Sequence, residues 1–236
     1  MKFELREKKG WSYYCIPQLE DKNINHGFFT RQSPSHSLQG DEKSNFLETF
    51  NLVDLVVMKQ EHGDHVHIIK DGNRPESGDG LVLIEKRIAG IVKTADCLPI
   101  IICEADYPVA SIVHAGWRGT VKKISRKAVE KMALLGAKRK KMAAFLGPSI
   151  NACCYEIGED VCNMFLKEGF SQEIFRREGK SVFLSIKTAN IEILRSEGID
   201  DIFDLDLCTC CNDNLFHSYR GGEKDKRQIN FVSLGV

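Results

Sequence analysis

Short apolar runs separated by turn residues dominate the middle of the chain. Four such runs follow one another at Leu81–Ile84, Ile88–Val92, Leu98–Cys103 and Val109–His114. They are rich in β-branched residues and are bounded by Gly, Asp or Pro, which is the pattern of strands in the interior of a sheet. We expect further strands at Trp11–Ile16, Leu55–Met58, Phe145–Gly147, Asp201–Leu207 and Ile229–Leu234.

A second pattern predicts helices between these strands. Ile124, Ala128, Met132 and Leu135 recur at helical spacing, with Gly136 as a stop. We expect Thr120 to cap this segment and further helices at 44–50, 159–165 and 188–196. The polar stretches 32–45 and 70–80 are predicted loops. Strands mixed with helices, without an internal repeat, predict one α/β domain over residues 1–236.

Composition narrows the classes of function. The 236 residues suffice for a sizeable core, and 33 basic side chains balance 33 acidic ones. Zero net charge gives no electrostatic reason to expect nucleic acid or an anionic membrane as partner. We see neither a secretory signal nor an apolar run of bilayer length, and nine cysteines are an odd number. We therefore expect reduced thiols and a cytoplasmic location.

Three dispersed residues, His62, Cys97 and His114, are a candidate metal site. A thiolate with two imidazoles suits zinc or copper better than magnesium or calcium. Three protein ligands leave one position open, as in a catalytic zinc site. Their spacing is a weak signal, and residue types alone favour a buried apolar Cys97 and a hydrogen-bonded core His114. A local site of His62, His65 and His67 ranks below the dispersed one.

The segment from His114 to Gly119 is harder to explain by packing alone. Gly116 and Gly119 indicate a backbone that turns sharply or approaches another group closely. Arg118 between them can bind carboxylate or phosphate through two hydrogen bonds. Trp117 offers an aromatic face, although a role as a core anchor is about as reasonable.

Two further groups of residues, one of cysteines and one of basic residues, are interpreted without a catalytic or metal-binding role. Cysteines at 153, 154, 208, 210 and 211 lack the paired two-residue gaps of zinc ribbons, so we interpret them as buried thiols. The basic run 138–141 is interpreted as a solvated surface.

Ordered motifs along most of the chain resemble the laccase-domain family, whose bacterial members have been called polyphenol oxidases, peptidoglycan-editing factors and purine nucleoside phosphorylases. They begin with His26-Gly-Phe-Phe-Thr-Arg31, Gln60-Glu-His-Gly63, Asp79-Gly-Leu-Val82 and Thr94-Ala-Asp-Cys-Leu-Pro99. They continue with Val113-His-Ala-Gly-Trp-Arg-Gly119, Gly147-Pro-Ser-Ile150, Cys154-Tyr-Glu-Ile-Gly158, Cys208-Thr209 and Phe216-His-Ser-Tyr-Arg220.

The resemblance implies a layered α/β/β/α sandwich with mixed β-sheets and carries the family's metal ligands onto His62, Cys97 and His114. It also implies phosphorolysis of adenosine, inosine and methylthioadenosine, and adenosine deamination, with purine nucleosides and phosphate as partners. Copper-dependent phenol oxidation is the older attribution. The chain departs from the family's motifs at 32–35 and 221–227, two loops that would affect the substrate pocket.

For this chemistry, zinc would supply hydroxide at neutral pH. Asp96 is the candidate general acid/base, or else a positioning carboxylate, and Arg31 and Arg118 are the candidate phosphate ligands. A rival interpretation is a metal-free hydrolase, in which Cys97 attacks an amide or ester, such as a cell-wall peptide, with His114 as base. A non-catalytic binding module is a third class. A homo-oligomer is compatible with the sequence.

Overall fold

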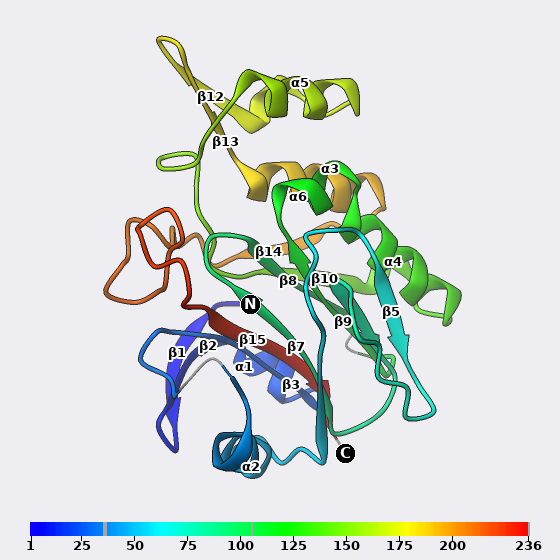
Figure 1. The fold of residues 1–236 in the computed structure, drawn as a ribbon. Helices are drawn as coiled ribbons and strands as arrows, with labels where there is room; N and C mark the ends of the chain where they lie inside the picture. The colour runs from blue at the N-terminus through cyan, green and yellow to red at the C-terminus, as the bar shows by residue number, and fades with distance from the viewer. Residues whose placement is uncertain (35–36, 105, 236) are drawn as a thin grey trace.

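The computed structural model describes residues 1–34, 37–104 and 106–235. Two six-stranded sheets form its centre (Figure 1). The strands of the first sheet run in the order β1 (Glu4–Lys8), β2 (Trp11–Cys15), β3 (Ile24–Phe29), β15 (Gln228–Leu234), β7 (Ile88–Thr94) and β4 (Asp54–Val57). Those of the second run in the order β14 (Asp201–Asp204), β10 (Met142–Leu146), β8 (Leu98–Glu104), β9 (Val109–Ala115), β6 (Gly80–Leu83) and β5 (Val66–Ile69).

Both sheets are mixed. The first is antiparallel except where β4 pairs with β7, and the second is parallel only at its two edges, β14–β10 and β5–β6. The chain crosses from the first sheet to the second between β4 and β5, and again between β7 and β8. These crossings place loop residues at the junction of the two sheets.

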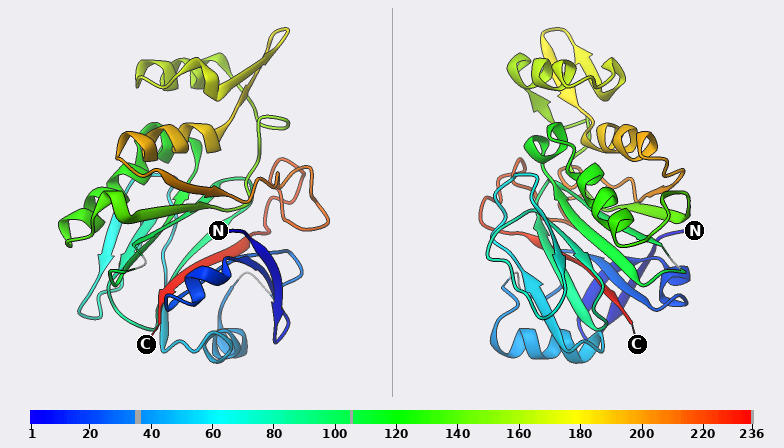
Figure 2. Two further views of the ribbon diagram at one scale, coloured as in Figure 1. Left: turned by 180° about the vertical axis from the view of Figure 1, so that it is seen from behind. Right: turned by 90° about the vertical axis from the view of Figure 1, so that its right-hand side faces the viewer.

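Apolar clusters show how the layers stack. Phe28 and Val232 of the first sheet pack with Ile101 and Phe145 of the second in the central core. Helices α4 (Ile124–Leu134) and α6 (Ile186–Ser196) cover the outer face of the second sheet, and α2 (Gly40–Thr49) covers that of the first (Figure 2). The short α1 (Pro17–Glu20) contacts β3. The predicted α/β/β/α fold class is confirmed.

A smaller unit extends from the second sheet. Helix α5 (Glu159–Lys167) packs with a three-stranded sheet of β11 (Glu156–Ile157), β13 (Ser181–Leu184) and β12 (Phe175–Glu178). Phe165 and Phe170 join this unit to α6 and to the short helix α3 (Trp117–Val121). Single 3₁₀ turns lie at Arg139–Lys141 and Gln172–Ile174. The structure contains no helix long and apolar enough to cross a bilayer, within the residues described.

The four central strands and the other predicted strands are confirmed within a few residues, and the basic run 138–141 is exposed as expected. Two predictions were wrong. The predicted loop 32–45 overlaps α2, which begins at Gly40, because Asp41 and Glu42 favour a helix start and Phe46 and Phe50 anchor the buried face. Residues 35 and 36 of that loop lie outside the described residues.

The second error concerns the cap of α4. Thr120 lies inside α3, where its hydroxyl accepts a hydrogen bond from Nδ2 of Asn190 (3.0 Å). The residue that precedes α4 is Lys123, which has a left-handed backbone conformation with φ of 60°. The hydroxyl of Thr120 is therefore used between helices rather than at a helix start.

Candidate metal centre

A β-hairpin brings two of the three predicted ligands together. Strands β8 and β9 are antiparallel, with Leu98 opposite Ala115 and Pro99 opposite His114. Cys97 immediately precedes β8, so it lies beside the end of β9 that carries His114. Two residues that are 17 positions apart in sequence thus become neighbours through strand register.

His62 reaches the same place from the turn between β4 and β5. Its backbone is left-handed, with φ of 56°, a conformation that non-glycine residues adopt at a cost. The Asp79 carboxylate holds this turn by accepting hydrogen bonds from the backbone N–H groups of Glu61 (3.2 Å), His62 (3.0 Å) and Gly63 (2.7 Å). These three hydrogen bonds stabilise the turn that points His62 at the hairpin.

The candidate ligand atoms of His62, Cys97 and His114 all lie within 4.8 Å of one another. The two imidazole rings are nearly perpendicular, at 82°, with centroids 4.8 Å apart. The structure thus brings the dispersed set together. The alternative local set is not assembled in this way, since Nε2 of His67 lies 2.9 Å from the carbonyl oxygen of Ser77.

Asp79 also orients His114. Its Oδ1 lies 2.8 Å from Nδ1 of the buried His114 ring. A carboxylate can only accept, so Nδ1 carries the proton and Nε2 remains for a ligand. Partners of this kind fix the tautomer and orientation of metal-binding histidines.

Cys97 and His114 also shift each other's pKa values. Burial favours the neutral thiol of Cys97, but the adjacent His114 and His62 lower its pKa to about 6. Burial likewise opposes protonation of His114, yet the Cys97 thiolate and Asp79 raise its pKa to about 9. Each of the two groups thus favours the charged form of the other.

Glycines let the backbone approach this site closely, as the sequence predicted. A Cβ on Gly116 would lie 3.3 Å from both Sγ of Cys97 and Cδ2 of His62. A Cβ on Gly119 would lie 2.5 Å from the carbonyl oxygen of Gly63, which is inside van der Waals contact. Helix α3 can therefore rest directly on the turn that carries His62.

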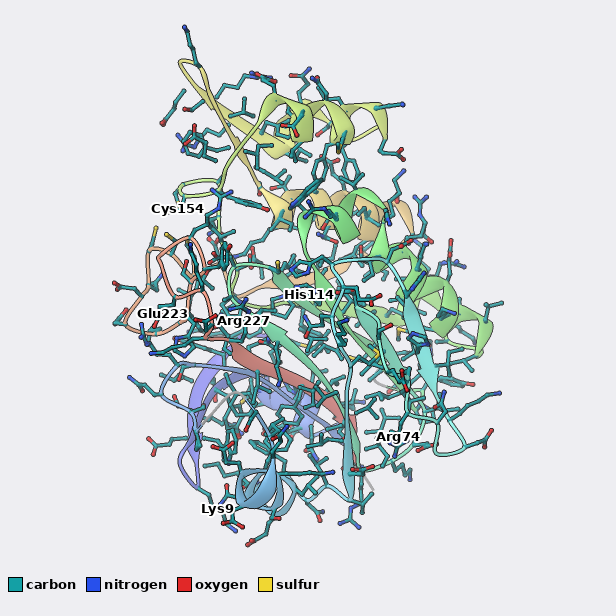
Figure 3. All side chains as sticks on the ribbon, viewed as in Figure 1. Lys9, Arg74, His114, Cys154, Glu223 and Arg227 are labelled. Carbon is teal, nitrogen blue, oxygen red and sulfur yellow. The ribbon has the colours of Figure 1, made fainter. Side chains whose placement is uncertain are left out.

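The triad faces a cavity of about 640 Å³. Its walls carry the aromatic residues Trp117, Tyr155 and Tyr219 and the cationic residues Lys93, Arg118, Arg220 and Arg227. Arg118 stacks on Trp117, with Cζ 4.3 Å from the ring centroid, and Arg220 lies over Tyr155 at 5.2 Å. Aromatic faces with several positive charges suit a planar base and an anionic group. Figure 3 labels His114 and Arg227, which both line this cavity.

Two other predicted site residues have different surroundings. Asp96 lines the cavity, but Oδ1 accepts a hydrogen bond from Oγ1 of Thr209 (2.7 Å) and Oδ2 accepts one from the backbone N–H of Arg220 (2.7 Å). These contacts favour the alternative that Asp96 positions neighbouring segments. Arg31 is not among the cavity-lining residues and pairs with Glu223 at 2.8 Å.

Several candidate residues were not identified from the sequence. Asp79, Tyr155 and Arg220 lie within quoted motifs, so a signal existed, but nothing in their spacing indicated a role. Arg227 lies in the loop that departs from the family pattern, and it nevertheless lines the cavity. Lys93 was not identified because a lysine near the end of a strand is common on protein surfaces. In the structure, burial lowers the pKa of its ammonium group.

The residues present fit a soft divalent metal, because one thiol and two imidazoles converge and Asp79 orients one of them. Fold and site together define a layered α/β protein with a candidate three-ligand metal site in an aromatic and cationic cavity. The chain belongs to the family described as multi-copper polyphenol oxidoreductase laccase, whose model matches residues 18–235.

Several known proteins are similar to this chain in sequence or structure. The chain is 36% identical to a purine nucleoside phosphorylase of Deinococcus radiodurans, over 61% of this chain and 55% of that relative. It is 33% identical to adenosine deaminase RL5 from an unknown prokaryotic organism, over 72% and 71% of the two chains. The crystal structure of the Bacillus licheniformis hypothetical protein YfiH superposes with a TM-score of 0.86 at 24% identity, covering 98% of each chain.

Proposed function

We propose that residues 1–236 form one catalytic unit, a zinc-dependent enzyme of purine nucleosides. Its reactions would be phosphorolysis of adenosine, inosine and methylthioadenosine, and deamination of adenosine. The observation that carries the proposal is the convergence of His62, Cys97 and His114 on a cavity with aromatic and cationic walls. Relatives named purine nucleoside phosphorylase and adenosine deaminase support it.

In phosphorolysis, a phosphate oxygen bonds to the anomeric carbon of ribose while the bond to the purine nitrogen breaks. In deamination, water adds to the purine carbon that bears the amine, and ammonia leaves. A bound zinc would supply Lewis acidity to either reaction. The chain's own contribution is to hold the reactants, with Arg118, Arg220 and Arg227 available for phosphate and the aromatic side chains for the purine.

Tyr155 is suited to donate a hydrogen bond while keeping its proton. Burial raises the pKa of its phenol well above the ordinary value, with the nearby Cys97 adding to the effect. The hydroxyl therefore keeps its proton at neutral pH and can donate a hydrogen bond to a departing purine. Asp96, with both oxygens engaged, would keep the loops that carry Thr209 and Arg220 in place.

Metal analysis coupled to a nucleoside product screen, with and without phosphate, tests the proposal. Replacement Cys97→Ala should remove about one equivalent of zinc per chain and all nucleoside turnover. Cys162→Ala, on α5, is the matched control and should retain both. The assignment would be refuted if Cys97→Ala kept as much zinc as the wild type, or if it lost that zinc and its nucleoside turnover were unchanged.

One observation favours a second candidate function. Cys97, His114 and Asp79 lie in a chain that resembles the nucleophile, base and orienting carboxylate of a cysteine hydrolase. Such an enzyme would attack an amide or ester, for example a cell-wall peptide. Inhibition by a strong chelator with recovery on adding zinc supports the nucleoside enzyme. Resistance to the chelator with rapid inactivation by a thiol alkylator supports the hydrolase.

Copper fits the same donors, so copper-dependent phenol oxidation is a further alternative. It is weaker because a single three-ligand site does not supply the several copper centres that full reduction of dioxygen requires.

A further inference from the structure

Four cysteines outside the triad gather at one edge of the second sheet. Cys153 and Cys154 lie in the turn after β10, and Cys208 and Cys211 lie in the turn after β14. Their sulfur atoms are all within 4.8 Å of one another, and neighbouring pairs are 3.3 to 3.6 Å apart. Cys153 and Cys211 are exposed, so the interpretation as buried thiols was wrong for these two, while Cys208 is buried as expected.

Strand pairing brings the two turns together. Because β10 and β14 are parallel neighbours, their carboxyl ends meet at the same edge. The ladder continues beyond them through a bridge between Ser149 and Cys208 and a hydrogen bond from the N–H of Thr209 to the carbonyl oxygen of Ser149 (3.1 Å). The sulfur positions thus follow from backbone structure that extends the sheet.

The spacing of the sulfurs suits a shared ion. Four sulfurs around zinc, each at about 2.3 Å in a tetrahedron, are roughly 3.8 Å from one another. The four residues are free thiols with separations close to that value. The backbone N–H of Asn151 also lies 3.4 Å from Sγ of Cys208, a donor of the kind that stabilises a thiolate.

We propose that Cys153, Cys154, Cys208 and Cys211 form a second metal site, a closed tetrathiolate site for zinc that is distinct from the His62, Cys97 and His114 triad. Four protein ligands leave no open position, so its role is structural. The residues next to it belong to the cavity region, since Tyr155 lines the wall and Thr209 donates to Asp96. The ion would fasten the two turns that hold these residues. Cys154 is labelled in Figure 3.

Zinc content per chain in single variants tests this site. Cys211→Ser should lose about one equivalent relative to the wild type, while the equivalent that Cys97→Ala removes is kept. Cys210→Ser is the matched control, because Cys210 lies in the same turn but outside the four-sulfur group, and it should keep all zinc. Unchanged zinc in Cys211→Ser would overturn the proposal.

X-ray absorption at the zinc edge gives a second readout, which can be made on the wild-type protein. Wild-type protein with both sites filled should show an average of roughly 2.5 sulfurs per zinc, against about one for the triad alone. In Cys97→Ala the remaining zinc should have about four sulfurs at roughly 2.3 Å. Fewer than two sulfurs per zinc in the wild type, or a disulfide among these residues in protein purified under reducing conditions, would overturn it.

Discussion

The carboxylate of Asp79 accepts a hydrogen bond from Nδ1 of His114 and, through the same oxygen atom, one from the backbone N–H of His62. One side chain therefore sets both the ring orientation of one candidate ligand and the backbone position of another. Asp79 therefore couples two candidate ligands that lie 52 positions apart in the sequence.

Replacing Asp79 by Asn should weaken metal binding at the triad. The amide keeps one acceptor but introduces N–H donors where backbone N–H groups and His114 require acceptors. We expect the zinc dissociation constant to rise about 10- to 100-fold, measured by competition with a chromogenic chelator. Asp54→Asn removes a carboxylate that pairs with Lys43 and Arg74 instead, and it should leave zinc affinity unchanged. Equal affinities in all three proteins would refute the coupling role.

Arg118 and Arg31 should differ in their effect on phosphorolysis. Arg118 lines the cavity, whereas Arg31 pairs with Glu223 and contacts the carbonyl oxygen of Asp213. Arg118→Ala should raise the KM for phosphate or lower kcat/KM roughly tenfold or more, because a charge-assisted hydrogen bond is lost. Arg31→Ala should change these constants less than about threefold. Steady-state kinetics with phosphate varied would contradict this expectation if Arg31→Ala were the more damaging change.

Burial of His26 should make stability fall in mild acid. Desolvation lowers its pKa to about 4, and the neutral ring accepts a hydrogen bond from the N–H of Ile16 through Nε2 (2.8 Å). The unfolded chain, with an ordinary pKa of 6.5, binds the proton more readily, so this contribution is complete above 6.5 and is lost as the pH falls toward 4. At pH 5 the loss is about 2 kcal/mol of unfolding free energy.

Urea unfolding at pH 7 and pH 5 measures the effect of His26. The variant His26→Gln should show a smaller drop between the two pH values than the wild type. His65→Gln, on an exposed side chain, should retain the wild-type drop. If His26→Gln and the wild type lost equal stability, the buried imidazole would not be the source.

Asn190 should be a large contributor to stability. Its Nδ2 donates to Oγ1 of Thr120 and its Oδ1 accepts from Oγ of Ser125, both at 3.0 Å, so it joins α6 to α3 and α4 in a fully buried network. Asn190→Ala would leave two buried hydroxyls without their partner and should cost about 2–4 kcal/mol. Arg195→Ala, on the exposed part of α6, should cost about 0.5 kcal/mol or less. Chemical denaturation distinguishes them, and similar losses would count against the network.

The sequence predicted those elements whose conformation is determined by neighbouring residues. The runs from Leu81 to His114 form buried strands, because β-branched residues between turn residues determine their conformation locally. Strand β3 was missed because His26 and Gly27 interrupt its apolar pattern, although both are buried by tertiary contacts. The ligand triad was predicted through motifs rather than spacing, since strand register and a loop crossing bring it together.

The spatial grouping of the four cysteines was not predicted, for the same physical reason. Adjacent Cys153 and Cys154 have no two-residue gap, and their partners lie more than fifty positions further along the chain. Only the parallel pairing of β10 with β14 makes the four sulfurs neighbours. Asp79 was likewise unremarked, because an Asp-Gly pair in a turn-rich stretch indicates a turn and nothing about a carboxylate that serves two ligands.

Two of the three candidate ligands, His62 and Cys97, lie on segments that pass from the first sheet to the second, while His114 belongs to the second sheet itself. These segments begin at strands β4 and β7 of the first sheet, so a displacement of one sheet against the other would pull on the turns that carry two of the three candidate ligands. Substitutions in the core between the sheets, for instance at Val232 or Phe145, should therefore change the affinity of the triad for its ion without contacting that ion. The metal affinity of this centre would report the alignment of the two sheets and would fall before the protein unfolds.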